Sequence, residues 1–151
     1  MFEKLASMYD VEGCPNGYIA CKCLNPCNFD VPERLLVSLE YLSRIKKYSN
    51  AAKFWECFSV PIVACEPKAI FEGLEREGED DSYCYCGIPT ERYLDKGQSV
   101  PWDKRFVLLV FVRWDERGLI AFDWERRRAD PDERGFPLNW RQDFRRLKWP
   151  D

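Results

Sequence analysis

The stretch RFVLLVFVRWDERGLIAFDWERRR, residues 105–128, decides the fold because it has the pattern of two strands joined by a tight turn. Residues 105–112 are apolar at every position but the first, which indicates a central strand covered on both faces. Residues 115–118, DERG, end in a glycine that suits the positive φ of a hairpin turn. Residues 119–128 then return as the partner strand. The stretch predicts an antiparallel hairpin at the centre of a sheet.

Residues 32–47, ahead of this hairpin, have the periodicity of a helix. Leucines and one isoleucine recur there at intervals of three and four residues, and Asp30 is placed to cap the first turn. Three shorter segments show the same spacing and are also expected to be helical, namely 2–9, 51–58 and 68–77. The first half of the chain is therefore expected to be mainly helical.

The remaining elements are expected to be short strands and one closing helix. Residues 17–23 and 83–88 have the composition of strands, and the apolar run 60–65 suits a strand or a buried connector. Residues 138–149 carry aromatic and leucine side chains at helical intervals, so they are expected to form a C-terminal helix.

This element order predicts the α+β class. We expect N-terminal helices packed on an antiparallel sheet of about four strands, with a C-terminal helix. The length of 151 residues fits a single globular domain over 1–151. Its helical region is expected to cover about 1–80 and its sheet-rich region about 83–151.

The composition excludes several kinds of catalytic site. The chain contains no histidine, which removes serine–histidine–aspartate triads, cysteine–histidine pairs and mixed zinc sites. The net charge is −3, so a surface that binds nucleic acid is not expected from charge alone. The sequence favours a protein that is not an enzyme.

The chain is expected to be cytoplasmic and to have no membrane partner. No stretch approaches the roughly 18 apolar residues that a membrane-spanning helix needs. The first residues, MFEKLASMYD, include acidic side chains and lack the apolar run of a secretory signal. Structural disulfides are rare in a reducing cytosol, so the eight cysteines are expected to be thiols.

Two cysteine pairs are candidates for a structural zinc site. Each pair is separated by one residue, and residues two apart on a strand point to the same face. Two paired strands would then bring four thiolates together, which is a ligand set that zinc accepts. The predicted metal ligands are Cys21, Cys23, Cys84 and Cys86. The alternatives are that these thiols are small buried apolar side chains, or that they serve a redox function.

Three charged residues near the end of the hairpin are a candidate magnesium site. Asp123, Glu125 and Arg127 share one strand face, and two carboxylates two residues apart can bind Mg²⁺. The PD-(D/E)xK nuclease pattern has a lysine where this chain has Arg127, and arginine is a poor base because it is always protonated. Charge pairing across the sheet is the alternative interpretation.

The last part of the chain interleaves arginine with tryptophan. Residues 124–149 hold eight basic and five acidic side chains, a local charge of +3. Arginine and tryptophan dominate the centres of protein interfaces, and together they also suit stacking and phosphate contacts with RNA. The predicted partner-binding residues are Trp124, Arg126, Arg127, Arg128, Trp140, Arg141, Arg145, Arg146 and Trp149. In the alternative, the aromatic residues pack a helix on the sheet and the arginines are solvated.

The sequence therefore favours a small interaction or regulatory protein, of the inhibitor or immunity type, that binds a partner protein through this Arg/Trp-rich end. One alternative is a nucleic-acid-binding protein or a histidine-free ribonuclease-type toxin. The other is a module stabilised by zinc on four cysteines. No cofactor is expected apart from that zinc ion.

Overall fold

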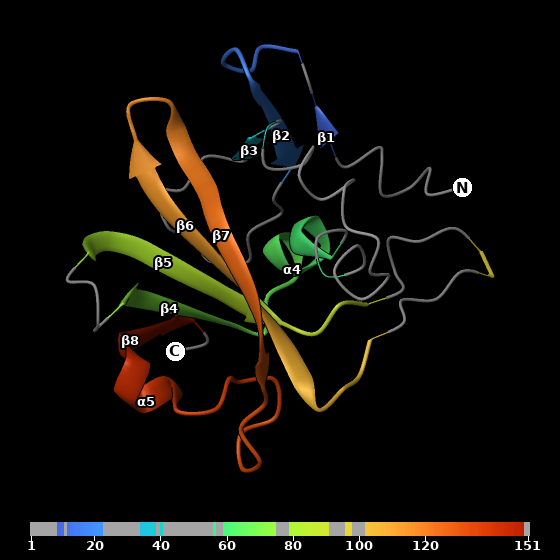
Figure 1. The fold of residues 1–151 in the computed structure, drawn as a ribbon, viewed down its shortest axis with the longest axis vertical. Helices are drawn as coiled ribbons and strands as arrows, with labels where there is room; N and C mark the ends of the chain where they lie inside the picture. The colour runs from blue at the N-terminus through green and yellow to red at the C-terminus, as the bar shows by residue number, and fades with distance from the viewer. Residues whose placement is uncertain are drawn as a thin grey trace.

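The computed structural model describes residues 9–10, 12–22, 34–38, 40, 56, 59–74, 79–90, 96–97 and 102–149. These residues form one eight-stranded sheet with two short helices (Figure 1). The elements in chain order are β1 (Tyr9–Asp10), β2 (Tyr18–Lys22), β3 (Arg34–Ser38), α4 (Val60–Cys65), β4 (Ala69–Leu74), β5 (Glu79–Gly87), β6 (Phe106–Asp115), β7 (Gly118–Arg128), α5 (Trp140–Asp143) and β8 (Phe144–Trp149).

The strand order is β1-β2-β3-β7-β6-β5-β4-β8. Every neighbouring pair is antiparallel except β3 and β7, which run parallel with Leu36 opposite Ile120. The β6–β7 hairpin is at the centre, and its strands pair from Asp115 opposite Gly118 at the turn to Phe106 opposite Arg128 at the open end. The sheet is therefore mixed, and both halves of the chain contribute strands to it.

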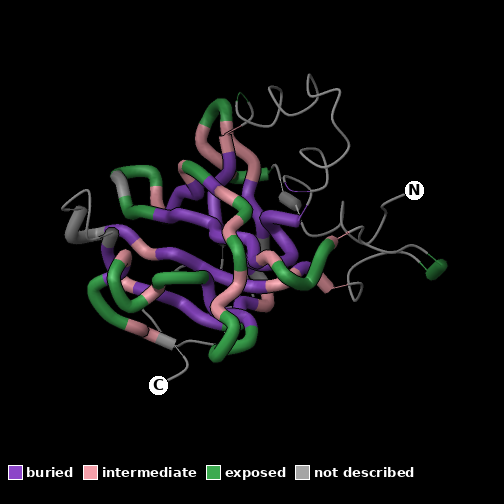
Figure 2. Tube along the Cα trace, turned by 60° about the horizontal axis from the view of Figure 1, so that its bottom comes forward, coloured by how far each residue is buried: buried purple, intermediate pink, exposed green. Residues whose placement is uncertain are grey.

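The first face of the sheet is covered by α4 and holds the largest core cluster. The four core residues that α4 contributes are Val60, Ile62, Val63 and Ala64. Alternate residues of the strands meet them, among them Tyr85 on β5 and Val110 on β6. Residues 107–112 of β6 are all buried, whereas buried and more exposed residues alternate in the second half of β7. Figure 2 shows buried segments through the middle of the molecule and exposed residues in many of the connections.

The second face is covered by the segment that follows β7. Phe136, Trp140 and Phe144 from this segment surround Phe71 of β4, with ring centroids 4.7–5.6 Å from that of Phe71. Phe71 itself is fully buried. A third, smaller cluster of the core joins β2, β3 and β7. Apolar side chains therefore project from both faces of the central strands, as the apolar run over residues 105–112 predicts.

The predicted α+β arrangement is wrong. Residues 34–38, expected within a helix, form β3, and residues 69–74, also expected to be helical, form β4. Both strands are covered on two faces, so consecutive residues are buried and the apolar positions coincide with helical spacing. The sheet has eight strands instead of about four, and the described residues within 1–80, a region expected to be helical, contribute β1, β2, β3 and β4 to it.

Two further segments have a secondary structure that differs from the predicted one. Residues 60–65, expected as a strand or connector, form α4, whose first turn contains Pro61. Proline fits that position because the first helical amides need no partner within the helix. In the predicted helix 138–149, only Trp140–Asp143 is helical. The following residues form β8 and pair with β4.

The hairpin over 105–128 and the strands at 17–23 and 83–88 are confirmed, with bounds that differ by a few residues. The helices predicted over 2–9 and 51–58 lie almost wholly outside the described residues. Most of the predicted helix after residue 38 also lies outside them.

Candidate interaction surface

Four basic side chains gather at the open end of the β6–β7 hairpin, which points downward in Figure 1. Lys104 and Arg105 precede β6, and Arg126 and Arg128 end β7; all four are exposed. Phe106 lies opposite Arg128, and the amide of Ala129 donates to the Arg105 carbonyl at 2.8 Å, so the two chain segments are held together. We call these four residues the basic rim.

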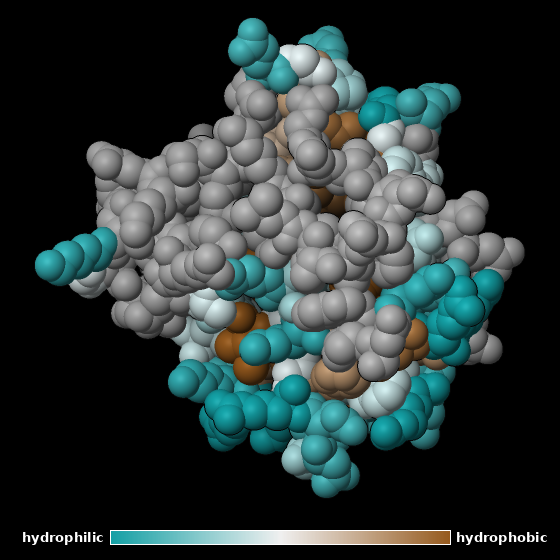
Figure 3. All heavy atoms as spheres, turned by 180° about the vertical axis from the view of Figure 1, so that it is seen from behind, coloured by the Kyte–Doolittle hydropathy of each residue, from teal (hydrophilic) through white to brown (hydrophobic). Residues whose placement is uncertain are grey.

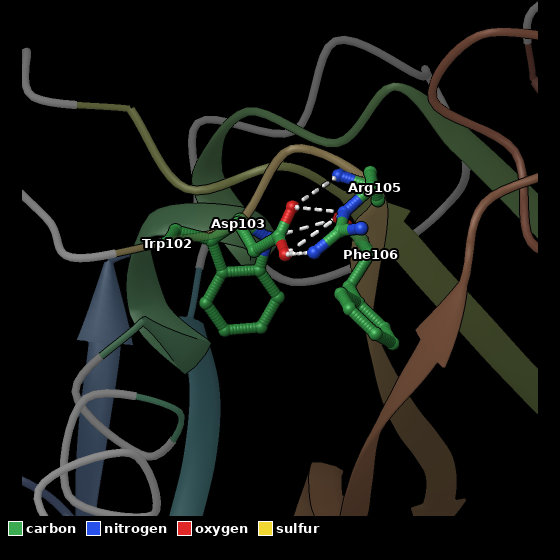
Figure 4. A network of polar contacts seen from close by, with 4 residues as sticks. All are labelled: Trp102, Asp103, Arg105 and Phe106. Carbon is green, nitrogen blue, oxygen red and sulfur yellow. Dashed lines mark hydrogen bonds and ion pairs between the residues drawn. The ribbon is translucent and has the colours of Figure 1, made fainter.

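The carboxylate of Asp103 contacts the basic rim. Asp103 accepts the Arg105 backbone amide at 2.9 Å and two guanidinium nitrogens, with Arg105 Nη2 at 2.7 Å from Asp103 Oδ2 (Figure 4). These hydrogen bonds from Arg105 lower the pKa of Asp103 to about 2. Asp103 therefore pairs with one of the four rim cations, and its hydrogen bonds hold the Arg105 side chain in place.

The side chains of Phe106 and Trp102 pack beside the rim residues. The Arg126 guanidinium carbon lies 4.5 Å from the centroid of the Phe106 ring. Trp102 packs against the first-face core, and its indole nitrogen donates to the Phe106 carbonyl at 2.9 Å. A guanidinium over an aromatic ring is attracted by the ring quadrupole and keeps its N–H groups directed outward. Leu138, whose amide donates to the Arg128 carbonyl, is also exposed beside the rim.

Among the nine predicted partner-binding residues, Arg126 and Arg128 lie on the rim. Arg127, between them, points to the second face of the sheet. Its guanidinium binds Glu125 at 3.0 Å and Asp143 at 2.8 Å, and its side chain is only 15% exposed. The structure thus confirms that Glu125 and Arg127 share a face, and the pairing between them supports the charge-pairing interpretation over a magnesium site.

The other predicted arginines are spread along α5 and β8. Arg141 lies over the Trp140 ring at 4.3 Å, and Arg146 donates to the carboxylate of Glu72. Arg145 lies across Gly73, where an added Cβ would meet the Arg145 side chain at 3.0 Å. No contact between these residues and the basic rim is observed in the described part of the chain.

The predicted tryptophans have different environments. Trp124 is 8% exposed and belongs to the first-face core, so its ring contributes to folding. Trp140 is half-buried in the second-face cluster, and its buried indole nitrogen has no hydrogen-bond acceptor among the described residues. The side chain of Trp149 lies outside what the structure describes.

The predicted four-cysteine zinc site is wrong for the described residues. Cys21 lies on β2, whereas Cys84 and Cys86 lie on β5, and three strands separate β2 from β5. At about 4.8 Å between strands, Cys21 is roughly 19 Å from the other two thiols. Cys23 lies outside the described residues. Within the described part of the chain, no three cysteine or acidic side chains form a metal-binding group.

Cys84 and Cys86 are buried thiols of the second-face core. Burial raises the pKa of both, and the Cys86 sulfur donates to the Gly135 carbonyl at 3.2 Å. A thiol that stays protonated is a poor nucleophile and a poor metal ligand. This environment agrees with the alternative in which the cysteines are small apolar side chains.

Asp103 gives the rim a pH dependence that can be measured. Its folded-state pKa of about 2 lies below the ordinary value of 3.8, so the ionised form is favoured by folding. The resulting stabilisation is present above pH ~4 and is lost as the pH falls toward ~2. We expect an NMR titration of the Asp103 carboxyl to give a midpoint near 2 in the natural protein.

The matched variant is Arg105→Gln, which removes the guanidinium and, because the side chain is exposed, is expected to leave the fold intact. In that variant the Asp103 midpoint is expected to return toward 3.8. An unchanged midpoint would contradict the assignment of the low pKa to Arg105.

Sequence reasoning missed Lys104, Arg105, Trp102 and Phe106. The signal was present, because a hairpin that turns at 115–118 must bring the residues before 106 beside the residues after 126. Regular pairing counted from the turn assigns the arginines to the wrong face, because one bulge shifts the register between Phe111 and Val112.

Figure 3, seen from behind, shows that the described side chains at the lower end of the molecule are mostly hydrophilic, with small apolar areas between them. None of the described helices is long and apolar enough to cross a bilayer. Comparison with protein-family models, with curated proteins and with solved structures finds no match.

Proposed function

We propose that this chain is an interaction protein that binds an acidic segment of a partner protein through the basic rim. The observation that carries the proposal is the clustering of four exposed cations at the open end of the central hairpin, of which Arg105 is bound by Asp103. None of the described residues forms an ion pair with Arg126 or Arg128. Guanidinium groups recognise carboxylates through paired N–H donors, which suits such a partner.

The aromatic side chains beside the rim, Phe106 and Trp102, are already in contact with other groups, which favours a protein partner over RNA. Recognition of single-stranded RNA relies on bases that stack on open aromatic faces. One face of Phe106 is already covered by Arg126, and Trp102 is held against the core. The exposed Leu138 beside Arg128 supplies an apolar contact of the kind found at protein interfaces. The net charge of −3 also disfavours a long polyanion.

The proposed compartment is the cytoplasm. The four cysteines whose side chains are described, Cys14, Cys21, Cys84 and Cys86, are thiols, which agrees with a reducing environment. A regulatory role, such as that of an inhibitor or immunity protein, is consistent with a rigid surface on a small domain. The backbone hydrogen bond from Ala129 to Arg105 and the pairing of β6 with β7 hold the rim in place and provide that rigidity.

Two labelled probes of similar length and charge test the proposal. We expect decaglutamate to bind more tightly than decauridylate at an ionic strength of about 150 mM, where long-range attraction is screened. Fluorescence anisotropy gives both dissociation constants. Tighter binding of decauridylate, with a steep loss on adding salt, would reject the protein-binding function in favour of nucleic acid.

A further inference from the structure

Asp103 binds Arg105 in the way that a carboxylate of a partner protein would bind it. Arg105 Nε lies 3.1 Å from each carboxylate oxygen of Asp103, and Arg105 Nη2 lies 2.7 Å from Asp103 Oδ2 (Figure 4). Two N–H groups on one edge of a guanidinium form the fork that recognises carboxylates. That edge of Arg105 therefore already holds a carboxylate, and this carboxylate comes from the chain itself.

The contact between the two side chains can break without disturbing the turn that carries them. The Asp103 carbonyl accepts the Phe106 amide at 3.0 Å, and Asp103 Oδ1 accepts the Arg105 amide at 2.9 Å. Neither of these bonds involves the guanidinium. The side chains of Arg105 and Asp103 are 72% and 39% exposed, and exposed ion pairs contribute little to stability. A carboxylate from solvent can therefore reach Arg105 and take the place of Asp103 there.

A second guanidinium lies close to this pair. The guanidinium carbon of Arg126 is 4.5 Å from the centroid of the Phe106 ring. Hydrogen bonds from Arg105 are the main cause of the low pKa of Asp103, and the positive charge of Arg126 adds to it. Arg128 follows two residues later on β7, so it lies on the same face of the strand, and both arginines are exposed. A segment that brings several carboxylates can thus bind these two arginines in addition to Arg105.

We propose that Asp103 is an internal competitor for partner carboxylates, and that an acidic segment binds to the basic rim by replacing Asp103 on Arg105. The inference rests on the proposed function and adds a selectivity to it. A single carboxylate gains nothing from the exchange, because one ion pair with Arg105 replaces another. A segment with several acidic residues also gains ion pairs with Arg126 and Arg128. Asp103 therefore makes the rim selective for clustered acidic residues over isolated ones.

The opposite role for Asp103 would be to orient Arg105 for the partner. The partner would then bind the guanidinium N–H groups that Asp103 leaves unused. The two roles predict changes of opposite sign when Asp103 is made neutral. Removal of a competitor tightens binding, whereas removal of an orienting group weakens it.

The variant Asp103→Asn separates these two roles. Asparagine keeps a side-chain oxygen that can accept the Arg105 amide, so the turn is expected to be retained. We expect this variant to bind labelled decaglutamate about threefold to fivefold more tightly than the natural protein at an ionic strength of about 150 mM, as measured by fluorescence anisotropy.

Two controls assign the gain to the release of Arg105. Glu116→Gln makes the same change in net charge at the exposed turn end of the hairpin, and it is expected to leave the affinity unchanged. In an Arg105→Gln background, Asp103→Asn is expected to change the affinity by less than about twofold, because no guanidinium remains to be released.

Displacement of Asp103 can be observed directly in the natural protein. NMR at neutral pH gives the signal of the Asp103 carboxyl carbon, and the Arg105→Gln variant gives its position in the absence of the guanidinium. Saturating decaglutamate is expected to move the signal toward that position. Acetate, at the same concentration of carboxylate groups, is expected to leave the signal in place.

The outcomes separate this inference from the function on which it rests. Equal or weaker binding of decaglutamate by Asp103→Asn, or an Asp103 signal that does not move while decaglutamate is bound, would overturn the competitor role and leave the proposed function standing. Equal displacement by acetate and decaglutamate would overturn the selectivity. Failure of the natural protein and all of these variants to bind decaglutamate would reject the proposed function, and this inference with it.

Discussion

Replacing Phe71 by alanine is expected to lower the free energy of unfolding by about 3–5 kcal/mol. Phe71 is fully buried, stacks on Phe144 at 4.7 Å and meets Phe136 edge-on at 5.6 Å, so the substitution leaves a cavity between the sheet and its C-terminal cover. Urea denaturation measures the loss. For a chain of this size, the melting temperature should fall by about 2–4 °C for each kcal/mol.

The matched control is Phe122→Ala, which removes the same group from a half-buried position and is expected to cost less than half as much. A double-mutant cycle with Phe71→Leu and Phe144→Leu then tests the β4–β8 contact itself. An aromatic pair in contact should give a coupling energy of about 0.5–1.5 kcal/mol. Additive effects of the two substitutions would show that β8 does not pack against β4 in this way.

The central hairpin was predictable because its signals are local. Two apolar strand patterns flank a turn that ends in Gly118, and the pairing brings together residues close in sequence. Nothing beyond this stretch had to be known to place the two strands side by side. The strand containing Cys84 and Cys86 was predictable for the same reason, since its composition alone favours a strand.

The strands β3 and β4 were not predictable in this way. Leu35, Leu36 and Val37 are all buried, because β3 is covered on both faces, and such a run has no period of two. Its parallel pairing with β7 joins segments about 80 residues apart in sequence, for which the sequence carries no local signal. The wrong helical assignment follows from this burial on both sides.

One bulge determines which arginines belong to the candidate surface. Val112 lies opposite Ala121 and Phe111 lies opposite Asp123, so Phe122 is the extra residue on β7. Because strand side chains alternate, a shift of one residue changes the face of every residue beyond it. This shift places Arg126 and Arg128 on the rim and directs Arg127 toward Asp143.

The cysteine spacing predicts which thiols share a strand face, but it does not predict which strands are neighbours in the sheet. The spacing of Cys84 and Cys86 correctly indicates two thiols on one face of a strand, and both belong to the second-face core. Whether Cys21 approaches them depends on strand order, which is a property of the whole chain. The sheet places β2 and β5 apart, and no local pattern predicts that separation.

The double substitution Arg126→Glu/Arg128→Glu is expected to weaken binding of decaglutamate about tenfold to hundredfold, a loss of about 1.4–2.8 kcal/mol. It removes half of the rim cations and places two carboxylates beside the bound segment. Both side chains are exposed, so the folded structure should be kept. Fluorescence anisotropy at fixed salt measures the dissociation constant.

The control for this variant is Arg113→Glu/Arg117→Glu, at the turn end of the same hairpin. It changes the net charge by the same amount and alters two exposed arginines. Its affinity for decaglutamate is expected to stay within about twofold of that of the natural protein, because distant exposed charges are screened. Equal losses in the two variants would mean that overall charge, and not the rim, governs binding.

Zero-length cross-linking in an extract of the native host tests the basic rim most directly. A carbodiimide joins an amine to a carboxylate only where the two are already in contact, and Lys104 is the rim residue with an amine. We predict that cross-links to the partner protein join Lys104 to aspartate or glutamate side chains, and that they are lost in Arg126→Glu/Arg128→Glu. Cross-links confined to Lys68, Lys96 or Lys148, with Lys104 unmodified, would contradict recognition at the rim.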